Sequence, residues 1–300
     1  MSQSLPIPDE FALDKSAPLL EVHDLVRTFR AVRAVDGLSF SIKKGQTVSL
    51  IGPNGSGKST TINLISGLLR PTSGKIIFAG RRINGLNSER VAALGIARTF
   101  QNGRVFGNMT VLDNVLVGMH THLEAARPFA SLRHIFGLRW IALLAETVMA
   151  IVRPPAVRRE EQQLLTEAQQ QLARFGERLQ PRQQQMSFTL SYANRRRTEI
   201  ARGLALRPQL LLLDEPTAGM NPTETAEVLE QLLELRAQGQ TILLVEHKLD
   251  LVMKLSDHVL VMDGGQLIAE GTPEEIQQNE RVIEAYLGRR RSQLAPAHEV

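Results

Sequence analysis

The sequence predicts an α/β fold built on a mainly parallel β-sheet with helices on both faces. From Arg207 onward, short apolar runs typical of buried strands alternate with longer segments of helical periodicity. Another such run ends at Gly52, where a glycine-rich stretch leads into a further helical segment. Length and composition agree, because 300 residues with 43% hydrophobic and 22% charged residues suffice for one large globular domain or two small ones.

Charge and composition argue against several kinds of protein. Lysine and arginine (35 together) barely exceed aspartate and glutamate (31), so the net charge of +4 gives little support to nucleic-acid binding. An aromatic content of 4% argues against stacking platforms for single-stranded nucleic acid. The chain has no cysteine, which excludes a disulfide framework, a thiolate zinc site and a cysteine nucleophile and fits a reducing compartment.

The two ends and one apolar window lie outside this pattern. Residues 1–18 contain three prolines and no apolar run of signal-peptide length, so we expect a flexible lead-in that directs no export. The window 135–152 has about the length of a membrane span, but Arg139 and Glu146 would be costly in a bilayer, which favours a buried or partner-facing helix. Residues 289–300, which begin with three arginines, are expected to form an unpacked basic tail.

The order of elements divides the chain into three stretches. Short β-type runs separated by turns crowd residues 19–80. After Thr110 the periodicity becomes helical, and Pro154-Pro155 breaks this region into two halves. From Arg207 strands and helices alternate, as a parallel sheet requires. We predict strands within 19–26, 38–45, 46–52, 74–80, 210–216, 241–247 and 258–265, and helices within 60–69, 111–119, 159–176, 223–239 and 248–256.

A glycine-rich stretch has the spacing of a phosphate-binding P-loop: Gly52, Pro53, Asn54, Gly55, Ser56, Gly57, Lys58 and Ser59, followed by Thr60. The glycines let successive backbone N–H groups turn toward a phosphate, and the helix N-terminus adds its positive dipole. Lys58 then supplies a charge for the β- and γ-phosphates, and Ser59 can ligate Mg²⁺. The alternative, a glycine-rich turn that binds nothing, does not explain the strand before it and the helix after it. We therefore predict a nucleotide site over residues 52–60.

Two further apolar runs end in polar residues, the first in Asp214 and Glu215, the second in Glu246 and His247. Ligands of open α/β sheets sit outside the carboxyl ends of the strands, so Asp214 can meet the Mg²⁺ held by Ser59 while Glu215 polarises a water aimed at the γ-phosphate. The alternative for the acidic pair is a cap of the following helix. His247 alone is more often a capping or solvated residue, but beside a P-loop it is a candidate γ-phosphate contact.

These motifs, together with the segment Leu190-Ser191-Tyr192-Ala193-Asn194 ahead of a helix, resemble the ATP-binding subunits of ABC transporters. The resemblance covers residues 19–288, and six short motifs fall in the order of that family. It implies a P-loop NTPase (RecA-like) core with an N-terminal antiparallel β portion and an α-helical subdomain inserted over about residues 102–203.

The resemblance also implies roles for single residues. Gln101 takes the place of the Q-loop residue, which reaches Mg²⁺, and Phe29 that of the adenine-stacking aromatic, although a lone phenylalanine after a strand is often part of a core. Ser191 and Ala193 belong to the signature that contacts ATP held by the opposite subunit. Asn221 falls where many members carry an aspartate in a loop that crosses the dimer interface.

Three stretches resemble most closely the ATPase subunits of branched-chain amino acid importers: RTFQN, AGMNPTET and LLVEHKLDLVMKLSDHVLVMDGG. Importers of urea, amides and other small polar solutes use similar subunits. The resemblance implies ATP and Mg²⁺ as cofactors and a peripheral place at the cytoplasmic face of the inner membrane. It implies as partners a second ABC ATPase subunit, two integral membrane permease subunits and, indirectly, an extracytoplasmic solute-binding protein, with no nucleic acid.

The signature departs from the family pattern, because Ala193 replaces a glycine and Asn194 a glutamine. If position 193 needs a positive φ or a close approach of the phosphate, the alanine costs about 1 kcal/mol, so a low-activity subunit of an asymmetric dimer is one alternative. Three arginines (195–197) then oppose the helix dipole, which is consistent with a nearby phosphate or simply with Glu199 and solvent. A soluble ABC ATPase acting on DNA or ribosomes is the other alternative, although this chain has one P-loop and no sustained heptads.

Overall fold

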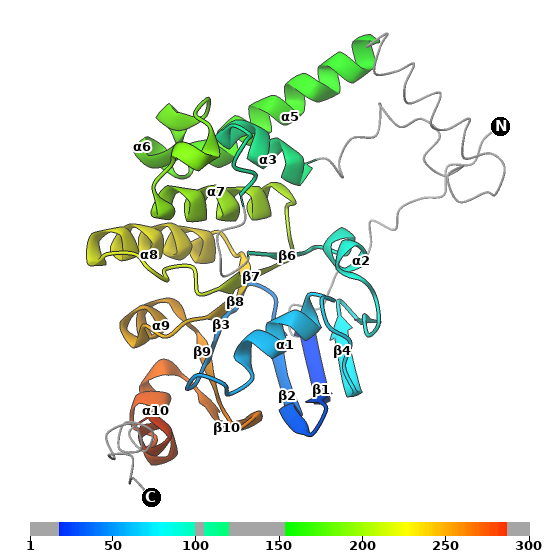
Figure 1. The fold of residues 1–300 in the computed structure, drawn as a ribbon, viewed down its shortest axis with the longest axis vertical. Coiled ribbons are helices and arrows are strands. Elements are labelled where there is room, and N and C mark those ends of the chain that lie inside the picture. The colour runs from blue at the N-terminus through cyan, green and yellow to red at the C-terminus, as the bar shows by residue number, and fades with distance from the viewer. Residues whose placement is uncertain (1–17, 100–104, 120–153, 287–300) are drawn as a thin grey trace, which may run out of the picture.

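The computed structural model describes residues 18–99, 105–119 and 154–286, in which helices pack beside two β-sheets (Figure 1). The strands are β1 (Pro18–Phe29), β2 (Val32–Lys43), β3 (Thr47–Ile51), β4 (Ser73–Phe78), β5 (Arg81–Arg82), β6 (Ile96–Arg98), β7 (Leu210–Asp214), β8 (Thr241–Val245), β9 (His258–Asp263) and β10 (Gln266–Gly271). The helices are α1 (Lys58–Ile65), α2 (Ser88–Ala93), α3 (Val111–Met119), α5 (Pro155–Ala173), α6 (Gly176–Leu179), α7 (Tyr192–Ala205), α8 (Pro222–Ala237), α9 (Leu249–Leu255) and α10 (Pro273–Gln277).

The N-terminal stretch forms a four-stranded antiparallel sheet of order β2-β1-β4-β5, which confirms the expected antiparallel portion. In β2, Leu38, Phe40 and Ile42 are buried while the serines between them are exposed. This alternation is the period of two that places successive side chains on opposite faces of a sheet.

The second sheet has six strands in the order β10-β9-β3-β8-β7-β6, all parallel except for the pair β9 and β10. The α/β fold expected from the sequence is thus confirmed. Strands β6 and β10 were not predicted: β6 has only three residues, and β10 has an apolar run of only three residues, all part-exposed.

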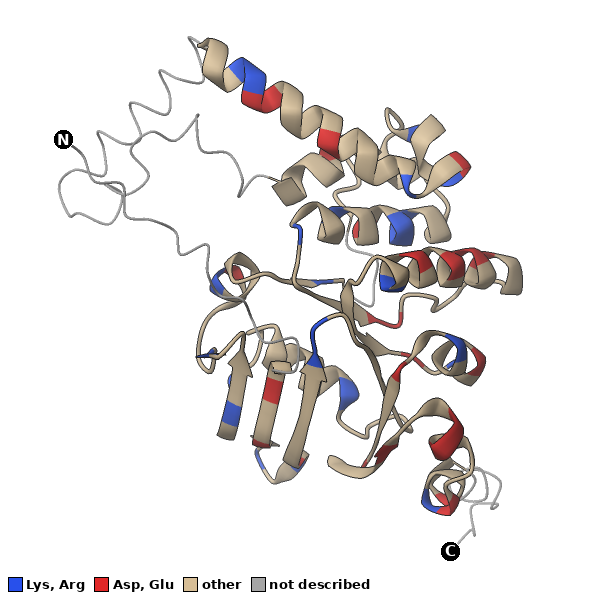
Figure 2. Ribbon diagram, turned by 180° about the vertical axis from the view of Figure 1, so that it is seen from behind, with Lys and Arg blue, Asp and Glu red and all other residues tan. Residues whose placement is uncertain are grey.

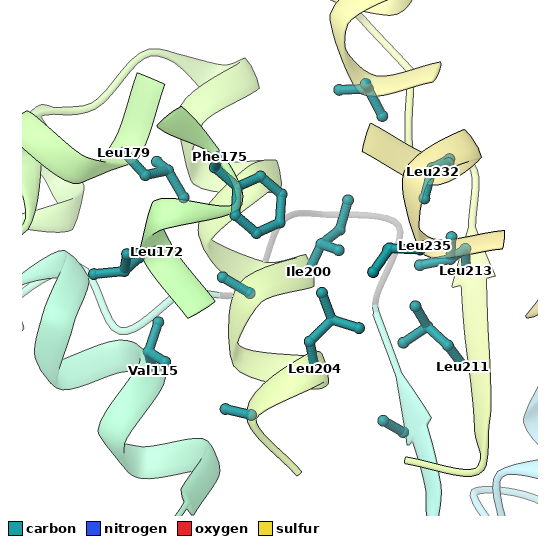
Figure 3. Close-up of a cluster of buried hydrophobic side chains, with 14 of the residues drawn as sticks. Val115, Leu172, Phe175, Leu179, Ile200, Leu204, Leu211, Leu213, Leu232 and Leu235 are labelled. Atoms are coloured by element: carbon teal, nitrogen blue, oxygen red, sulfur yellow. The ribbon is translucent and has the colours of Figure 1, made fainter. Parts of the chain in front are cut away.

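Alternating leucines of β7 connect the sheet to two different cores. Leu211 and Leu213 pack with residues of α7 and α8 on one face (Figure 3). Leu210 and Leu212 belong to a second cluster, which includes α1 and the antiparallel sheet. Helices therefore lie on both faces, as predicted, and on the second face α1 shares the cover with the antiparallel sheet.

Helices α3, α5 and α6 gather on α7, on the side away from the six-stranded sheet (Figure 1). Val115, Leu172, Phe175 and Leu179 meet Ile200 of α7 in the same apolar cluster (Figure 3). Within the described ranges, no helix has the length and apolar character needed to cross a membrane. The window 135–152, the C-terminal tail and residues 1–17 of the predicted lead-in lie outside those ranges, whereas Pro18 already begins β1. The boundaries of the helical insertion stay a prediction.

Candidate functional site

Three candidate segments follow three neighbouring strands of the parallel sheet. Strand β8 lies between β3 and β7, and its Val245 pairs with Leu50 on one side and Asp214 on the other. Parallel strands end at one edge of a sheet, so the glycine-rich loop, His247 and Glu215 emerge side by side there. Neighbouring strands are about 4.8 Å apart, which puts the three ends within about 10 Å of one another.

The glycine-rich loop has the backbone that a phosphate cradle requires. Gly52, Gly55 and Gly57 have φ angles of 147°, 81° and 104°, which side chains rarely allow. A β-carbon on Gly57 would lie 2.3 Å from the carbonyl oxygen of Ala34 on β2. Lys58 is 5% exposed, and its Nζ donates to two loop carbonyl oxygens at 2.9 Å. The ammonium therefore sits within the loop, where it can meet an incoming phosphate.

Ser59 and Asp214 offer oxygen ligands of the kind that Mg²⁺ prefers. Ser59 is exposed in the first turn of α1, while Asp214 is 2% exposed at the end of β7. Arg98 donates from Nη2 to Oδ2 of Asp214 at 3.1 Å, whereas the buried Oδ1 accepts no hydrogen bond from the described residues. Burial raises the pKa of Asp214, and the guanidinium of Arg98 opposes this shift. A buried oxygen without a donor fits a metal ion or its water, so this donor set suits a divalent cation.

Glu215 and His247 form a pair at the sheet edge. Oε1 of Glu215 lies 2.9 Å from Nε2 of His247, and the two side chains are 15% and 38% exposed. Glu215 has a left-handed φ of 48°, and its carbonyl oxygen accepts a hydrogen bond of 2.8 Å from Arg196. The helix-cap alternative for the acidic pair is wrong, because α8 begins at Pro222 with Asn221 as its cap. A carboxylate in this position can accept a proton from a water molecule.

The signature segment forms the start of α7. Ser191 is exposed and is the N-cap, with its side chain accepting a hydrogen bond of 3.3 Å from the N–H of Asn194. Ala193 is 2% exposed and helical, and its φ is not positive. The backbone strain considered for this alanine is therefore absent, while the effect of its methyl group on a close phosphate approach, and with it the low-activity alternative, stays a prediction. Asn194 Oδ1 accepts a hydrogen bond of 2.8 Å from the Arg197 guanidinium, so this side-chain amide has a partner within the chain.

The three arginines after the signature have partners within the chain. Arg195 donates to the carbonyl oxygen of Leu190 at 3.0 Å, and Arg196 forms a buried pair with Glu199 at the same distance. Arg197 reaches Glu227 on α8 at 2.6 Å. Figure 2 shows acidic positions repeating along α8 beside basic positions on α7. These contacts account for the positive charge at the helix start without a phosphate.

We expect Arg196→Met to lower the free energy of unfolding by about 3 kcal/mol, because it leaves Glu199, 1% exposed, without the arginine half of its ion pair. Urea denaturation of the purified chain measures this loss. The double variant Arg196→Met with Glu199→Leu removes both charges and should recover part of the stability. A double variant no more stable than the single one would contradict this account.

The loop 217–221 lies against the signature segment. The ring of Tyr192 comes within 3.4 Å of the position that a β-carbon on Gly219 would occupy. At the end of the loop, Asn221 Oδ1 accepts from the N–H of Glu224 at 2.9 Å, and the Glu224 side chain accepts from the N–H of Asn221. The Asn221 side chain thus has a capping role beside the interface role that the resemblance implies.

Of the last two candidate residues, Phe29 lies within the described residues and Gln101 does not. Phe29 ends β1 with 41% of its surface exposed, and the guanidinium of Arg27 lies 4.5 Å from the centroid of its ring. This exposure excludes the core alternative, while adenine stacking stays a prediction. Gln101 lies outside the described residues, so its role also stays a prediction.

Sequence reasoning missed three charged residues that surround the site. Arg98 joins Asp214 to α1 through Asn63, whose Oδ1 accepts at 2.6 Å. Glu246 is 2% exposed and Lys248 part-buried, on either side of His247. Only Glu246 carried a signal, because a charge directly after a buried strand is seldom buried without partners, whereas Arg98 ends a strand too short to be predicted and Lys248 lies beyond the strand end.

Comparison with known proteins agrees with this geometry. Residues 35–218 match the family model described as ABC transporter, and residues 266–291 match that of branched-chain amino acid ATP-binding cassette transporters. The chain is 40% identical over 274 residues to BraF of Pseudomonas aeruginosa, a high-affinity branched-chain amino acid transport ATP-binding protein, covering 91% of this chain and 99% of the relative. It is 38% identical to LivG of Escherichia coli, with the same description and the same coverage.

Solved structures give the same result. The chain is similar to an ATP-binding cassette of an ABC transporter in its ADP conformation, with a TM-score of 0.73, 32% identity, and 91% of this chain and 100% of that chain covered. A nucleotide-free ATP-binding cassette matches with a TM-score of 0.72 and 31% identity, covering 90% of this chain and 99% of the other. The chain therefore belongs to the ABC transporter family, as one of its ATP-binding and ATP-hydrolysing subunits.

Proposed function

We propose that the chain powers the import of branched-chain amino acids, or of a related small polar solute, through two membrane-embedded permease subunits. The observation that carries this proposal is the match of residues 266–291 to the branched-chain transporter model. The described part of that segment holds β10 and α10, which pack beside β9 at the edge of the sheet. A match there points to the subfamily, because none of the residues assigned to ATP or Mg²⁺ lies in this segment.

Within this site we assign Glu215 as the general base or water-positioning group. Lys58 and His247 stabilise charge on the γ-phosphate, and the N–H groups of residues 52–60 hold the phosphate chain. Asp214, Ser59 and Gln101 hold Mg²⁺, which neutralises phosphate charge when bound. Phe29 stacks on the adenine.

A second ATPase subunit, identical or related, completes the site. Ser191 stands exposed at the N-terminus of α7, where backbone N–H groups and the helix dipole favour the phosphates of a nucleotide held by that partner. The loop ending at Asn221 lies beside this signature and crosses the interface. We place the assembly at the cytoplasmic face of the inner membrane, with a solute-binding protein on the other side.

An exposed apolar cluster supports the docking of the permease. Phe106, Met109, Met186 and Phe188 are 49%, 39%, 44% and 58% exposed. The backbone joins them, since Ser187 donates to Met109 and Phe188 to Gly107, at 2.9 and 3.1 Å. Large exposed apolar side chains in a group mark interaction sites, and two members of this group, Phe106 and Met109, follow residue 101 closely in the chain.

We expect Phe188→Glu to reduce recovery of the permease subunits with the tagged chain by about tenfold or more, because a charge would enter an apolar contact. The measurement is purification in mild detergent followed by identification of the bound proteins. Binding of ATP to the purified variant should stay unchanged.

Ile283→Glu is the matched control, since Ile283 is 43% exposed but follows α10, which lies at the opposite end of the molecule from α3 (Figure 1). It should leave the recovery of membrane subunits unchanged. Recovery of wild-type chain with ribosomes or DNA instead of membrane proteins would overturn the proposed function.

A further inference from the structure

We propose that Glu246 and Lys248 tie the loop 217–221 to His247, so that the loop and the histidine move as one unit. Both are positioning residues that act through His247 and Glu215. The inference rests on the proposed function in one respect: the loop is taken to face a second ATPase subunit.

Glu246 holds Thr217, the first residue of the loop 217–221, through its side-chain carboxylate. It ends β8 with 2% of its surface exposed, and its Oε1 accepts hydrogen bonds from the backbone N–H of Thr217 at 3.1 Å and from the Thr217 hydroxyl. Its Oε2 accepts from the backbone N–H groups of His247 at 2.8 Å and Lys248 at 3.3 Å. One buried carboxylate thus joins two chain segments that are about 30 residues apart, and each charge-assisted bond is stronger than a neutral one.

Lys248 also holds the loop 217–221, through carbonyl oxygens of the loop and a hydroxyl group on α8. Its Nζ donates to the carbonyl oxygens of Thr217 and Met220 at 3.1 and 3.4 Å and to the hydroxyl of Thr225 on α8 at 2.7 Å. An ammonium has three hydrogens, so these contacts use its full donor capacity. A long, flexible side chain loses rotamer entropy when it is held in this way, and its partners must offset that cost.

The two residues flank His247, which is paired with Glu215. Glu215 in turn lies just before the loop in the chain, so the contacts form a closed ring: loop, Glu246 and Lys248, His247, Glu215, and the loop again. A shift of the loop by a neighbouring subunit would displace His247 together with it. The ring therefore couples contact at the subunit interface to the placement of the group that meets the γ-phosphate.

The test compares Lys248→Met with the wild type in two assays. In steady-state ATPase assays of the assembled transporter, kcat should fall on the order of tenfold while the KM for ATP changes less than about twofold, because positioning is lost and not nucleotide binding. In the full-length chain alone, amide hydrogen exchange over residues 217–221 should become on the order of tenfold faster. Lys248→Arg, which keeps a cationic donor, should restore most of the kcat.

Two controls separate this coupling from a general loss of structure. Lys254→Met removes an exposed lysine from α9, the helix that follows Lys248, and should change neither assay. Thr225→Val alone should slow turnover, but it should add no further loss to Lys248→Met, because both substitutions remove the same hydrogen bond between Lys248 and Thr225. Wild-type kcat and wild-type exchange in Lys248→Met would overturn the inference. If no transporter assembles, the proposed function fails, and the exchange assay on the chain alone still decides the tether.

Discussion

Replacing Glu215 with glutamine should lower ATP turnover by at least about 100-fold and leave the affinity for ATP nearly unchanged. Glutamine keeps the size of the side chain and an oxygen that can bond to His247, but its neutral amide cannot accept a proton from water. The contacts that hold the backbone of Glu215 from Arg196 are made to a carbonyl oxygen and survive the change. Only the chemical step therefore loses its base.

Phosphate release and equilibrium ATP binding, measured on the same preparation, separate these two effects. A trapped ATP-bound dimer, seen by light scattering, is the expected companion of slow turnover. Glu230→Gln, an exposed change of the same kind on α8, should behave as wild type. Near-normal turnover in Glu215→Gln would show that another group activates the water.

Replacing Gly57 with alanine should lower the free energy of unfolding of the nucleotide-free chain by about 3 kcal/mol. Its φ of 104° already disfavours a side chain. The new β-carbon would also lie 2.3 Å from the carbonyl oxygen of Ala34 and 3.1 Å from Cε of Met262, and the first of these atoms belongs to the backbone of β2. The loop must move to relieve the clash, so ATP binding should weaken as well.

Gly55→Ala is the matched control in the same loop. Gly55 has a φ of 81°, but a β-carbon there would meet no atom within 4 Å. Its cost should be that of the backbone alone, about 1 kcal/mol. Urea denaturation of both variants without nucleotide gives the comparison. Equal losses of unfolding free energy would show that the contact with β2 does not destabilise Gly57→Ala.

The sequence predicted those parts of the molecule in which the signal is local. The P-loop has its glycines, lysine and serine within eight positions, and the strand runs at Leu210 and Thr241 are continuous and apolar. Each of these patterns is set by short-range sterics and burial, so it is readable without the fold.

The rest depends on pairings between distant segments. The order β3-β8-β7 puts His247 between the P-loop and Glu215, and nothing in the spacing of the motifs states that order. The partners of Arg98 and Lys248 come from other strands and helices, so these residues looked like ordinary surface charges. Ala193 illustrates the opposite case: a family pattern raised the question of a positive φ, but the helix begins one residue earlier and gives the alanine an ordinary conformation.

The left-handed backbone of Glu215 has a consequence for engineering. Glycine or asparagine at position 215 would adopt this φ of 48° at a free-energy cost about 1 kcal/mol lower than that of glutamate. A selection for heat resistance alone would therefore favour loss of the very carboxylate that turnover needs. Engineering for higher thermal stability must therefore keep glutamate at position 215 and introduce stabilising substitutions at other positions.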